Sequence, residues 1–207
     1  MRFLSLRHAI YRELEKGLFR FLAARQRRAH TVIVFERDLR LIGMPRLKLA
    51  QHSSLKIGAQ CILRSESASN PIGIDQPITF CTLAHGAQII IGDNVGISGG
   101  TICARELVEI GRDTLIGANT YIFDNDFHPL DPIARAKDDY SAVRSAPVRI
   151  GTNVFIGTRS IVLKGVTIGD NTVIGAGSVV THSIPSNCVA GGNPCTVRGQ
   201  LPSTYAQ

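Results

Sequence analysis

The sequence has no Trp, and aromatic residues make up only 6% of its 207 positions, whereas Gly occurs 20 times. Large rings are the usual means of filling a compact core, because each one buries a large apolar area. Their scarcity beside so many glycines indicates a core that is built from small, repeated aliphatic layers.

Long apolar runs and dense charge are absent as well. No apolar stretch reaches the roughly 18 residues that a membrane-spanning helix requires, so we expect the chain not to cross a bilayer. Hydrophobic residues make up 44% of the chain and charged residues 19%, which argues against both disorder and a coiled coil. The length fits one domain of ordinary size, or one domain with an appendage.

Cysteine is sparse and irregularly spaced, and no CxxC pair is present, which argues against a disulfide scaffold and against a zinc site of that type. Cysteine at repeating apolar positions is usually a small core residue, and this is the interpretation that we favour. Basic residues interrupt the amino-terminal apolar positions, so no secretory signal peptide is expected. We therefore expect a cytoplasmic protein with reduced thiols. The five cysteines are Cys61, Cys81, Cys103, Cys188 and Cys195.

The formal charge of +7 is concentrated at one end of the chain. Residues 1–48 contain twelve Lys or Arg and four Asp or Glu, a net charge of +8, so the remaining 159 residues carry −1. Apolar residues at helical spacing alternate with these charges and predict a basic amphipathic helix of about 20 residues. These apolar residues are Phe3, Leu6, Ile10, Leu14, Leu18 and Phe21. We assign residues 1–48 as a basic helical arm.

Three roles compete for this arm, and two of them stay open. It can dock its apolar stripe on its own domain or on a sister subunit. It can also bind the surface of an anionic membrane peripherally, which would hold a cytoplasmic protein at the inner face. Binding to nucleic acid is not expected, because no recognition module or interleaved aromatic platform accompanies the charge.

Most of the chain is a repeat of six residues. Every sixth position from Ile150 to Val180 is aliphatic, and Gly follows four of these six positions. Neither the helical period nor strict alternation explains a spacing of six. The spacing fits a solenoid in which a short strand turns a corner every six residues and three strands make one triangular coil. We expect this domain at 49–200, followed by a tail at 201–207.

The repeat segments resemble those of the hexapeptide-repeat acyltransferases, whose fold is a left-handed parallel β-helix. The segments are IGDNVG (91–96), IGRDTL (110–115), IGTNVF (150–155), IGDNTV (168–173) and IGAGSV (174–179). The segment 174–198 is most similar to the maltose, galactoside and polysaccharide O-acetyltransferases. The resemblance implies an all-β fold, acetyl-CoA as the acyl donor, no metal, and a homotrimer with active sites between subunits.

The repeat breaks at about 123–147, where the chain reads FDNDFHPLDP (123–132). A long polar interruption of a solenoid maps to a loop on one face, often the binding face. Acyl transfer to an alcohol needs a base for the hydroxyl proton, and a histidine suits this task near neutral pH. The resemblance implies that His128 is this base. A zinc site is not expected, because His85, His128 and His182 are 43 and 54 residues apart.

The resemblance also implies where coenzyme A and the acceptor bind. Four residues match positions along the coenzyme groove, namely Gly157, Thr158, Ala176 and Thr181. His182 stands where related proteins often have Lys near the coenzyme phosphate. Arg198 is a candidate contact for the 3′-phosphate. Lys164 is an alternative phosphate contact. The candidate acceptor contacts are Ser98, Asp124, Asn125 and Asp126. Turn formation is an equally good interpretation of the three residues at 124–126.

The predicted function is acetyl-CoA-dependent O-acetylation of a sugar hydroxyl in the synthesis of a surface polysaccharide or lipopolysaccharide. No residue is typical of an activated nucleophile, so direct transfer within a ternary complex is expected. Two alternatives remain open at this point. One is N-acetylation of an amino sugar on the same fold, and the other is a non-catalytic hexapeptide-repeat scaffold that assembles through its basic arm.

Overall fold

The computed structural model describes residues 17, 21, 24 and 30–202, and all of its strands fall into three sheets. Sheet A contains six parallel strands, which are β1 (Val32–Phe35), β4 (Ser54–Ile57), β7 (Gln88–Ile91), β10 (Leu107–Ile110), β13 (Val148–Ile150) and β16 (Thr167–Ile168). Sheet C also contains six, which are β3 (Arg46–Lys48), β6 (Thr79–Thr82), β9 (Thr101–Ala104), β12 (Tyr121–Phe123), β15 (Ile161–Val162) and β18 (Val179–Val180).

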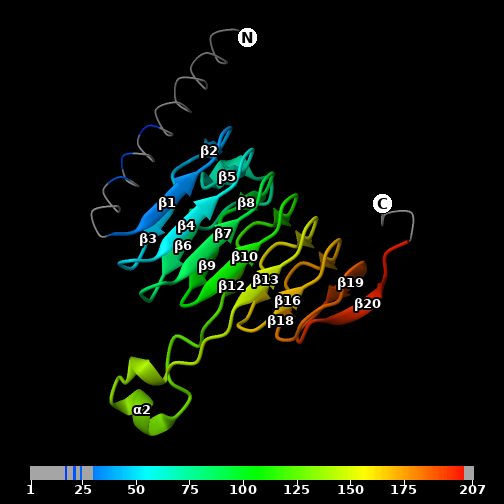
Figure 1. The fold of residues 1–207 in the computed structure, drawn as a ribbon. Helices are drawn as coiled ribbons and strands as arrows, with labels where there is room; N and C mark the ends of the chain where they lie inside the picture. The colour runs from blue at the N-terminus through cyan, green and yellow to red at the C-terminus, as the bar shows by residue number, and fades with distance from the viewer. Residues whose placement is uncertain (1–16, 18–20, 22–23, 25–29, 203–207) are drawn as a thin grey trace.

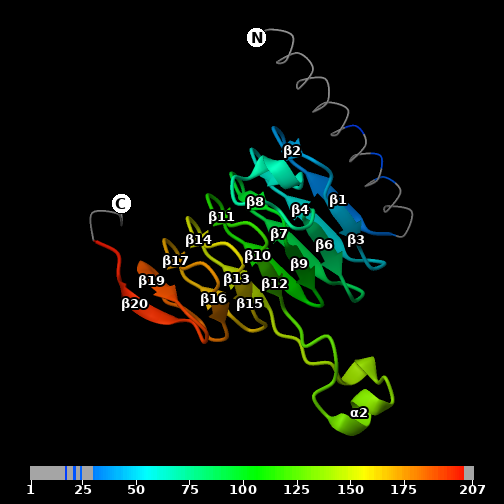
Figure 2. The same ribbon diagram turned by 180° about the vertical axis from the view of Figure 1, so that it is seen from behind.

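Sheet B is longer by two strands and closes the carboxy-terminal end of the molecule. Its parallel strands are β2 (Arg40–Ile42), β5 (Ile62–Arg64), β8 (Gly96–Ser98), β11 (Leu115–Ile116), β14 (Phe155–Ile156), β17 (Val173–Ile174) and β19 (Cys188–Gly191). The last strand, β20 (Thr196–Gln200), pairs with β19 in the antiparallel direction. The chain visits sheets A, B and C in turn, so that each circuit stacks on the one before (Figures 1 and 2).

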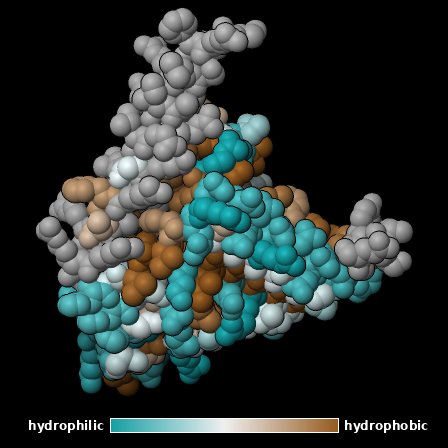
Figure 3. All heavy atoms as spheres, turned by 45° about the horizontal axis from the view of Figure 1, so that its top comes forward, coloured by the Kyte–Doolittle hydropathy of each residue, from teal (hydrophilic) through white to brown (hydrophobic). Residues whose placement is uncertain are grey.

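This arrangement is a three-sided parallel β-helix, and it confirms the all-β solenoid that the period of six predicts. The six residues of the predicted register, from Ile150 to Val180, are all buried at 3% exposure or less. Stacked aliphatic layers of this width explain the scarcity of aromatic residues, because Phe80 is the only ring among the largest fully buried side chains of the described residues. On the outside, polar and apolar residues form alternating bands across the coils (Figure 3).

Asparagine stabilises the corner at which sheet A turns into sheet B. Asn153 and Asn171 have φ values of 54° and 56°, in the left-handed region that Asn tolerates better than most residues. Their side chains form a ladder along the helix axis, because Asn153 donates to Asn171, which in turn donates to Asn187, each at 2.9 Å. The repeated IGDN and IGTN segments therefore encode both the turn and the contact between successive turns.

The β-helix begins at β1, so residues 32–48 belong to it and not to the N-terminal arm in which the sequence analysis placed them. Ile33, Leu39 and Leu41 are buried in the first coil, whereas Arg40, Arg46 and Lys48 are exposed on its outer surface. Part of the basic charge of residues 1–48 thus lies on the outside of a coil. The amphipathic helix predicted for the first 20 residues lies almost wholly outside the described residues, as do residues 203–207.

Two insertions interrupt the regular coils. Paired residues of sheet A are 19 positions apart between Ile89 and Val108, but 34 apart between Leu55 and Ile89, because residues 65–78 form an additional loop. This loop contains the short 3₁₀ helix η1 (Ser67–Ser69). The second insertion, at 124–147, contains α2 (Pro132–Ala136) and η2 (Tyr140–Ala142) and projects away from the stack (Figure 1).

Two glycines with similar backbone angles provide a matched test of coil packing. Gly86 and Gly100 have φ values of 78° and 86°, which cost an L-residue about 1–2 kcal/mol each. A Cβ at Gly86 would meet nothing within 4 Å, whereas one at Gly100 would lie 2.0 Å from the carbonyl oxygen of Thr120 in the next coil. We expect Gly86→Ala to lower the free energy of unfolding by about 1 kcal/mol, and Gly100→Ala by about 3 kcal/mol or more. Urea denaturation measures both losses, and equal losses would contradict the close packing at Gly100.

Candidate functional site

The insertion at 124–147 leaves the β-helix through Asp124, which is fully buried. Its carboxylate accepts hydrogen bonds from the backbone N–H groups of Arg105, Glu106 and Leu107 at 2.7–2.8 Å. Arg105 and Glu106 form the preceding turn between sheets C and A, and Leu107 begins β10. Asp124 therefore anchors the start of the loop on the neighbouring coil, and its oxygen atoms are not available to an acceptor.

Asn125 is also buried, at 1% exposure. Its side chain donates to Asp124 at 3.2 Å and accepts from the backbone N–H of Phe127 at 2.9 Å. The sequence predicts Asp124 and Asn125 as acceptor contacts, but in the structure both side chains are engaged in hydrogen bonds within the turn. These short polar side chains accept hydrogen bonds from backbone N–H groups at the turn. Turn formation was the other interpretation of these residues that the sequence left open.

Asp126 links the same loop to the next coil. Its Oδ1 atom lies 2.7 Å from Nζ of Lys164, which occupies the following turn between sheets C and A. Its Oδ2 atom is buried and has no hydrogen-bond partner within the described part of the chain. The carbonyl oxygen of Asp126 accepts a hydrogen bond from the N–H of His128 at 2.6 Å. Asp126 thus connects the position of the histidine to the body of the β-helix.

His128 is exposed at the tip of the turn that these residues form. Phe127 precedes it with a φ of 59° and packs edge-on against Phe123 of β12, with ring centroids 5.2 Å apart. The imidazole centroid lies 6.1 Å from the ring centroid of Tyr140. The imidazole makes no hydrogen bond to any residue that the structure describes, so both of its nitrogen atoms are available to a substrate.

The turns between sheets C and A form one edge of the prism, which we call the C–A edge. It carries the root of the loop that holds His128, then Lys164 one coil later, and then Thr181 and His182 after β18. The hydroxyl of Thr181 lies 2.8 Å from Nδ1 of His182. The structure therefore places these two predicted coenzyme contacts along the same edge as the predicted base.

The turns between sheets B and C form a second edge, the B–C edge, which carries most of the other predicted coenzyme contacts. A Cβ at Gly157 would lie 2.4 Å from the backbone nitrogen of Ala176, so only Gly allows these turns to stack at this distance. The hydroxyl of Thr158 donates to the carbonyl of Ala118 at 2.7 Å. Arg198 lies on β20 of sheet B, where its Nε atom donates to the carbonyl of Gly191, the last residue of β19, at 3.2 Å.

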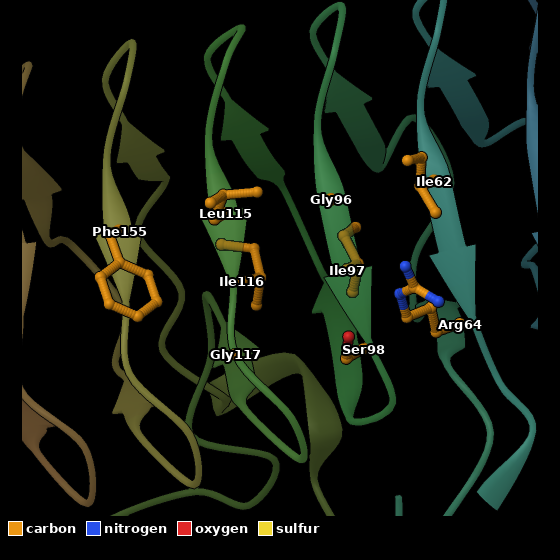
Figure 4. Close-up of a pocket in the computed structure, with 9 residues that line it drawn as sticks. All are labelled: Ile62, Arg64, Gly96, Ile97, Ser98, Leu115, Ile116, Gly117 and Phe155. Atoms are coloured by element: carbon orange, nitrogen blue, oxygen red, sulfur yellow. The ribbon is translucent and has the colours of Figure 1, made fainter. Parts of the chain in front are cut away.

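Ser98 lies in a shallow pocket on the outer face of sheet B. It is 9% exposed and sits beside Arg64, its register partner on β5, whereas Leu115 and Phe155 supply much of the apolar lining (Figure 4). Ser98 ends β8 and thus lies near the B–C edge, whereas His128 belongs to the C–A edge. Within one chain, sheet C separates Ser98 from the predicted base.

The insertion at 65–78 places a polar cluster on the B–C edge that the sequence did not predict. The carboxylate of Asp75 pairs with Arg159 at 2.8 Å, and its backbone N–H donates to Asn119 at 2.9 Å. Gln76 donates to the hydroxyl of Tyr121 at 3.1 Å. The spacing of 34 between equivalent inward residues was the signal in the sequence that marked this insertion.

No group of three His, Cys, Asp or Glu side chains among the described residues is arranged to hold a metal ion. Within the same residues, no helix is long and apolar enough to span a membrane.

Comparison with known proteins relates this chain to acetyltransferases. A family model for the hexapeptide repeat of succinyl-transferase matches residues 147–182. The galactoside O-acetyltransferase of Escherichia coli (strain K12) is 40% identical over 125 residues, which cover 60% of this chain and 58% of that protein. The chain thus matches less than two thirds of the length of that relative.

A second relative matches over a greater length. The WbbJ protein of Escherichia coli (strain K12), which carries a provisional name as a lipopolysaccharide biosynthesis O-acetyl transferase, is 38% identical over 171 residues, or 79% of this chain and 80% of that protein. A solved galactoside acetyltransferase in complex with coenzyme A superposes with a TM-score of 0.50 and 27% identity, and the match covers 86% of this chain and 68% of that one. The chain therefore belongs to the hexapeptide-repeat acetyltransferase family.

Proposed function

We propose that the protein transfers the acetyl group of acetyl-CoA to a hydroxyl group of a sugar and that His128 is the general base. One observation carries the assignment of the base. His128 is exposed beside the β-helix, with no hydrogen bond from its ring to the described residues, while buried contacts of Asp124 and Asn125 fix the turn that presents it. A general base must be within reach of the hydroxyl proton and be held in place, and this arrangement supports both requirements.

The donor site is proposed along the carboxy-terminal coils. Tight stacking of Gly157 on Ala176 leaves a flat edge at which a thin, extended pantetheine arm can approach the backbone. The guanidinium of Arg198 on β20 suits phosphate oxygens. The coenzyme A complex of the similar galactoside acetyltransferase supports coenzyme A as the carrier.

We further propose a homotrimer in which the donor groove lies between two subunits. The candidate coenzyme contacts of one chain are divided between the B–C edge, with Thr158 and Ala176, and the C–A edge, with Thr181 and His182. Sheet C lies between the two edges. If the B–C edge of one subunit faces the C–A edge of its neighbour, both groups contact one coenzyme molecule, and Ser98 of one copy approaches the base of the other.

The proposed reaction is direct transfer within a ternary complex. His128 removes the proton of the acceptor hydroxyl while its oxygen attacks the thioester carbonyl. A backbone N–H near the coenzyme stabilises the oxyanion, and the protonated imidazole then returns the proton to the departing thiolate. His128 thus acts first as a base and then as an acid, and no covalent acyl-enzyme is formed.

The acceptor is proposed to be a sugar unit of a surface polysaccharide or lipopolysaccharide, which the likeness to WbbJ over four fifths of its length supports. A cytoplasmic location, with the basic N-terminal arm in contact with the inner face of a membrane, suits such an acceptor. The left-handed winding of the β-helix and the amphipathic helix in the arm belong to the same proposal. They rest on the resemblance and on the apolar spacing in the sequence.

A matched pair of acceptors tests the chemistry of the transfer. We expect release of coenzyme A thiol from acetyl-CoA with a hexose or an oligosaccharide, and a product that mild alkali cleaves because it is an ester. A hexosamine with the same ring serves as the control. An alkali-stable product that forms only with the hexosamine would contradict O-acetylation and show transfer to the amine.

A further inference from the structure

Cys81 and Cys103 are neighbours on the outer face of sheet C. They occupy paired positions on the adjacent parallel strands β6 and β9. Phe80 and Ile102, which precede them, point into the core, so both thiols project from the opposite face. Paired strands lie about 4.8 Å apart, within the Cα separation of about 4.4–6.8 Å that disulfides span.

The two thiols already interact in the reduced protein. Cys81 lies between Lys48 on β3 and Cys103 on β9, at paired positions of sheet C. The neighbouring Cys103 thiol and the ammonium group of Lys48 lower the pKa of Cys81 to about 7. The neighbouring Cys81 sulfur and burial both raise the pKa of Cys103. Cys81 is half-buried and is thus the thiol of this pair that a solute can reach.

Cys103 also contacts the root of the loop that carries His128. Its carbonyl oxygen accepts a hydrogen bond from the backbone N–H of Asp124 at 3.4 Å, and the nearby side chains of Asn125 and Asp124 act on the pKa of its thiol. Asn125 in turn accepts the backbone N–H of Phe127, the residue before His128. A change in the position of the Cys103 sulfur therefore acts on the network that fixes the turn.

We propose that Cys81 and Cys103 form a reversible disulfide bond that withdraws the Cys103 sulfur from Asn125 and lowers acetyl transfer. The effect of the disulfide bond on acetyl transfer rests on the function proposed above, whereas the formation of the bond does not depend on that function. This pair differs from Cys61, which is fully buried and donates to the carbonyl of Gly92 at 3.2 Å.

The oxidant in this reaction is a small disulfide such as oxidised glutathione. The Cys81 thiolate attacks one glutathione sulfur, so that a mixed disulfide forms and one glutathione thiolate leaves. The Cys103 thiol then loses its proton and attacks the Cys81 sulfur, which releases the second glutathione. Two electrons and the two thiol protons pass from the cysteine pair to two molecules of glutathione. The first step also removes the negative charge at Cys81 that raises the pKa of Cys103.

The sequence allows the bond to be detected directly. Cleavage before aspartate separates Cys81, in the fragment 75–92, from Cys103, in the fragment 93–112. After treatment with oxidised glutathione and blocking of free thiols, we expect mass spectrometry to find these two fragments joined, and dithiothreitol to separate them. Cys81→Ser and Cys103→Ser should abolish the joined pair, and Cys61→Ser should retain it. Separate, fully alkylated fragments from the oxidised wild-type protein would overturn the proposal.

The same samples test the connection to the loop. We expect oxidation to lower acetyl transfer about tenfold or more in the wild type and in Cys61→Ser, because small displacements of a positioned base lower rates by such factors. Treatment with dithiothreitol should restore the rate. Cys103→Ser should not respond to the oxidant. Joined fragments with unchanged transfer would overturn the effect on activity. An inactive reduced wild type would count against the proposed function, while the fragment assay would still decide on the bond.

Discussion

His128→Ala is expected to lower kcat/KM for acetyl transfer by about a hundredfold or more, while binding of coenzyme A is retained. The variant removes the base from the acceptor hydroxyl, but it leaves unchanged both Gly157 and Ala176 on the B–C edge and Thr181 on the C–A edge. The buried contacts of Asp124 and Asn125 do not involve the imidazole, so the loop should keep its fold. Steady-state thiol release gives the rate, and calorimetric titration with coenzyme A gives the affinity.

His85→Ala is the matched control for this experiment. His85 is also exposed in the turns between sheets C and A, but it lies two coils before the loop, where its ring stacks on His52 with centroids 4.6 Å apart. We expect this variant to retain wild-type turnover. Near-normal turnover of His128→Ala, or an equal loss in both variants, would contradict the role of His128 as the base.

Asp124→Ala is expected to destabilise the protein by about 3 kcal/mol or more. The variant removes a fully buried carboxylate and leaves the backbone N–H groups of Arg105, Glu106 and Leu107 without their acceptor at a partly buried site, where each unsatisfied group costs about 1–3 kcal/mol. Asp124→Asn should also be destabilising, because its amide presents N–H donors to N–H donors. Urea denaturation measures the loss for both variants.

Asp131→Ala provides the comparison for this loss. Asp131 caps α2, and its exposed carboxylate accepts from the N–H groups of Ile133 and Ala134 at 2.7 and 2.8 Å. Loss of such a cap costs about 1 kcal/mol. A smaller loss for Asp124→Ala than for Asp131→Ala would show that Asp124 does not anchor the loop.

The regular coils could be predicted because each layer of the core leaves its mark at a fixed spacing. Ile156, Val162 and Ile168 are buried as the period of six predicts, and the Gly that follows Ile156 stacks against the next turn. The first coil was missed because its aliphatic residues are spaced irregularly and lie among basic residues. Ile33 and Leu39 are six apart, but Pro45 takes the place of the next member.

The sequence names candidate residues for the site but not their geometry. A loop that contains one histidine, together with the family resemblance, predicts a base, yet the sequence does not tell whether a neighbouring carboxylate faces the substrate or the backbone. Asp124 and Asp126 differ by two positions, and one is fully buried on backbone N–H groups while the other pairs with Lys164. The sequence also does not reveal which turns share an edge of the prism, and for this reason the division of the candidate coenzyme contacts between two edges emerged only from the fold.

The most direct test of the account is thiol release from acetyl-CoA, measured for the wild type and His128→Ala with the same panel of sugars and oligosaccharides. We predict release that depends on a hydroxylated acceptor in the wild type, and its loss in the variant at unchanged affinity for coenzyme A. Absence of release with every acceptor, together with no binding of coenzyme A by calorimetry, would contradict the account and favour a non-catalytic scaffold.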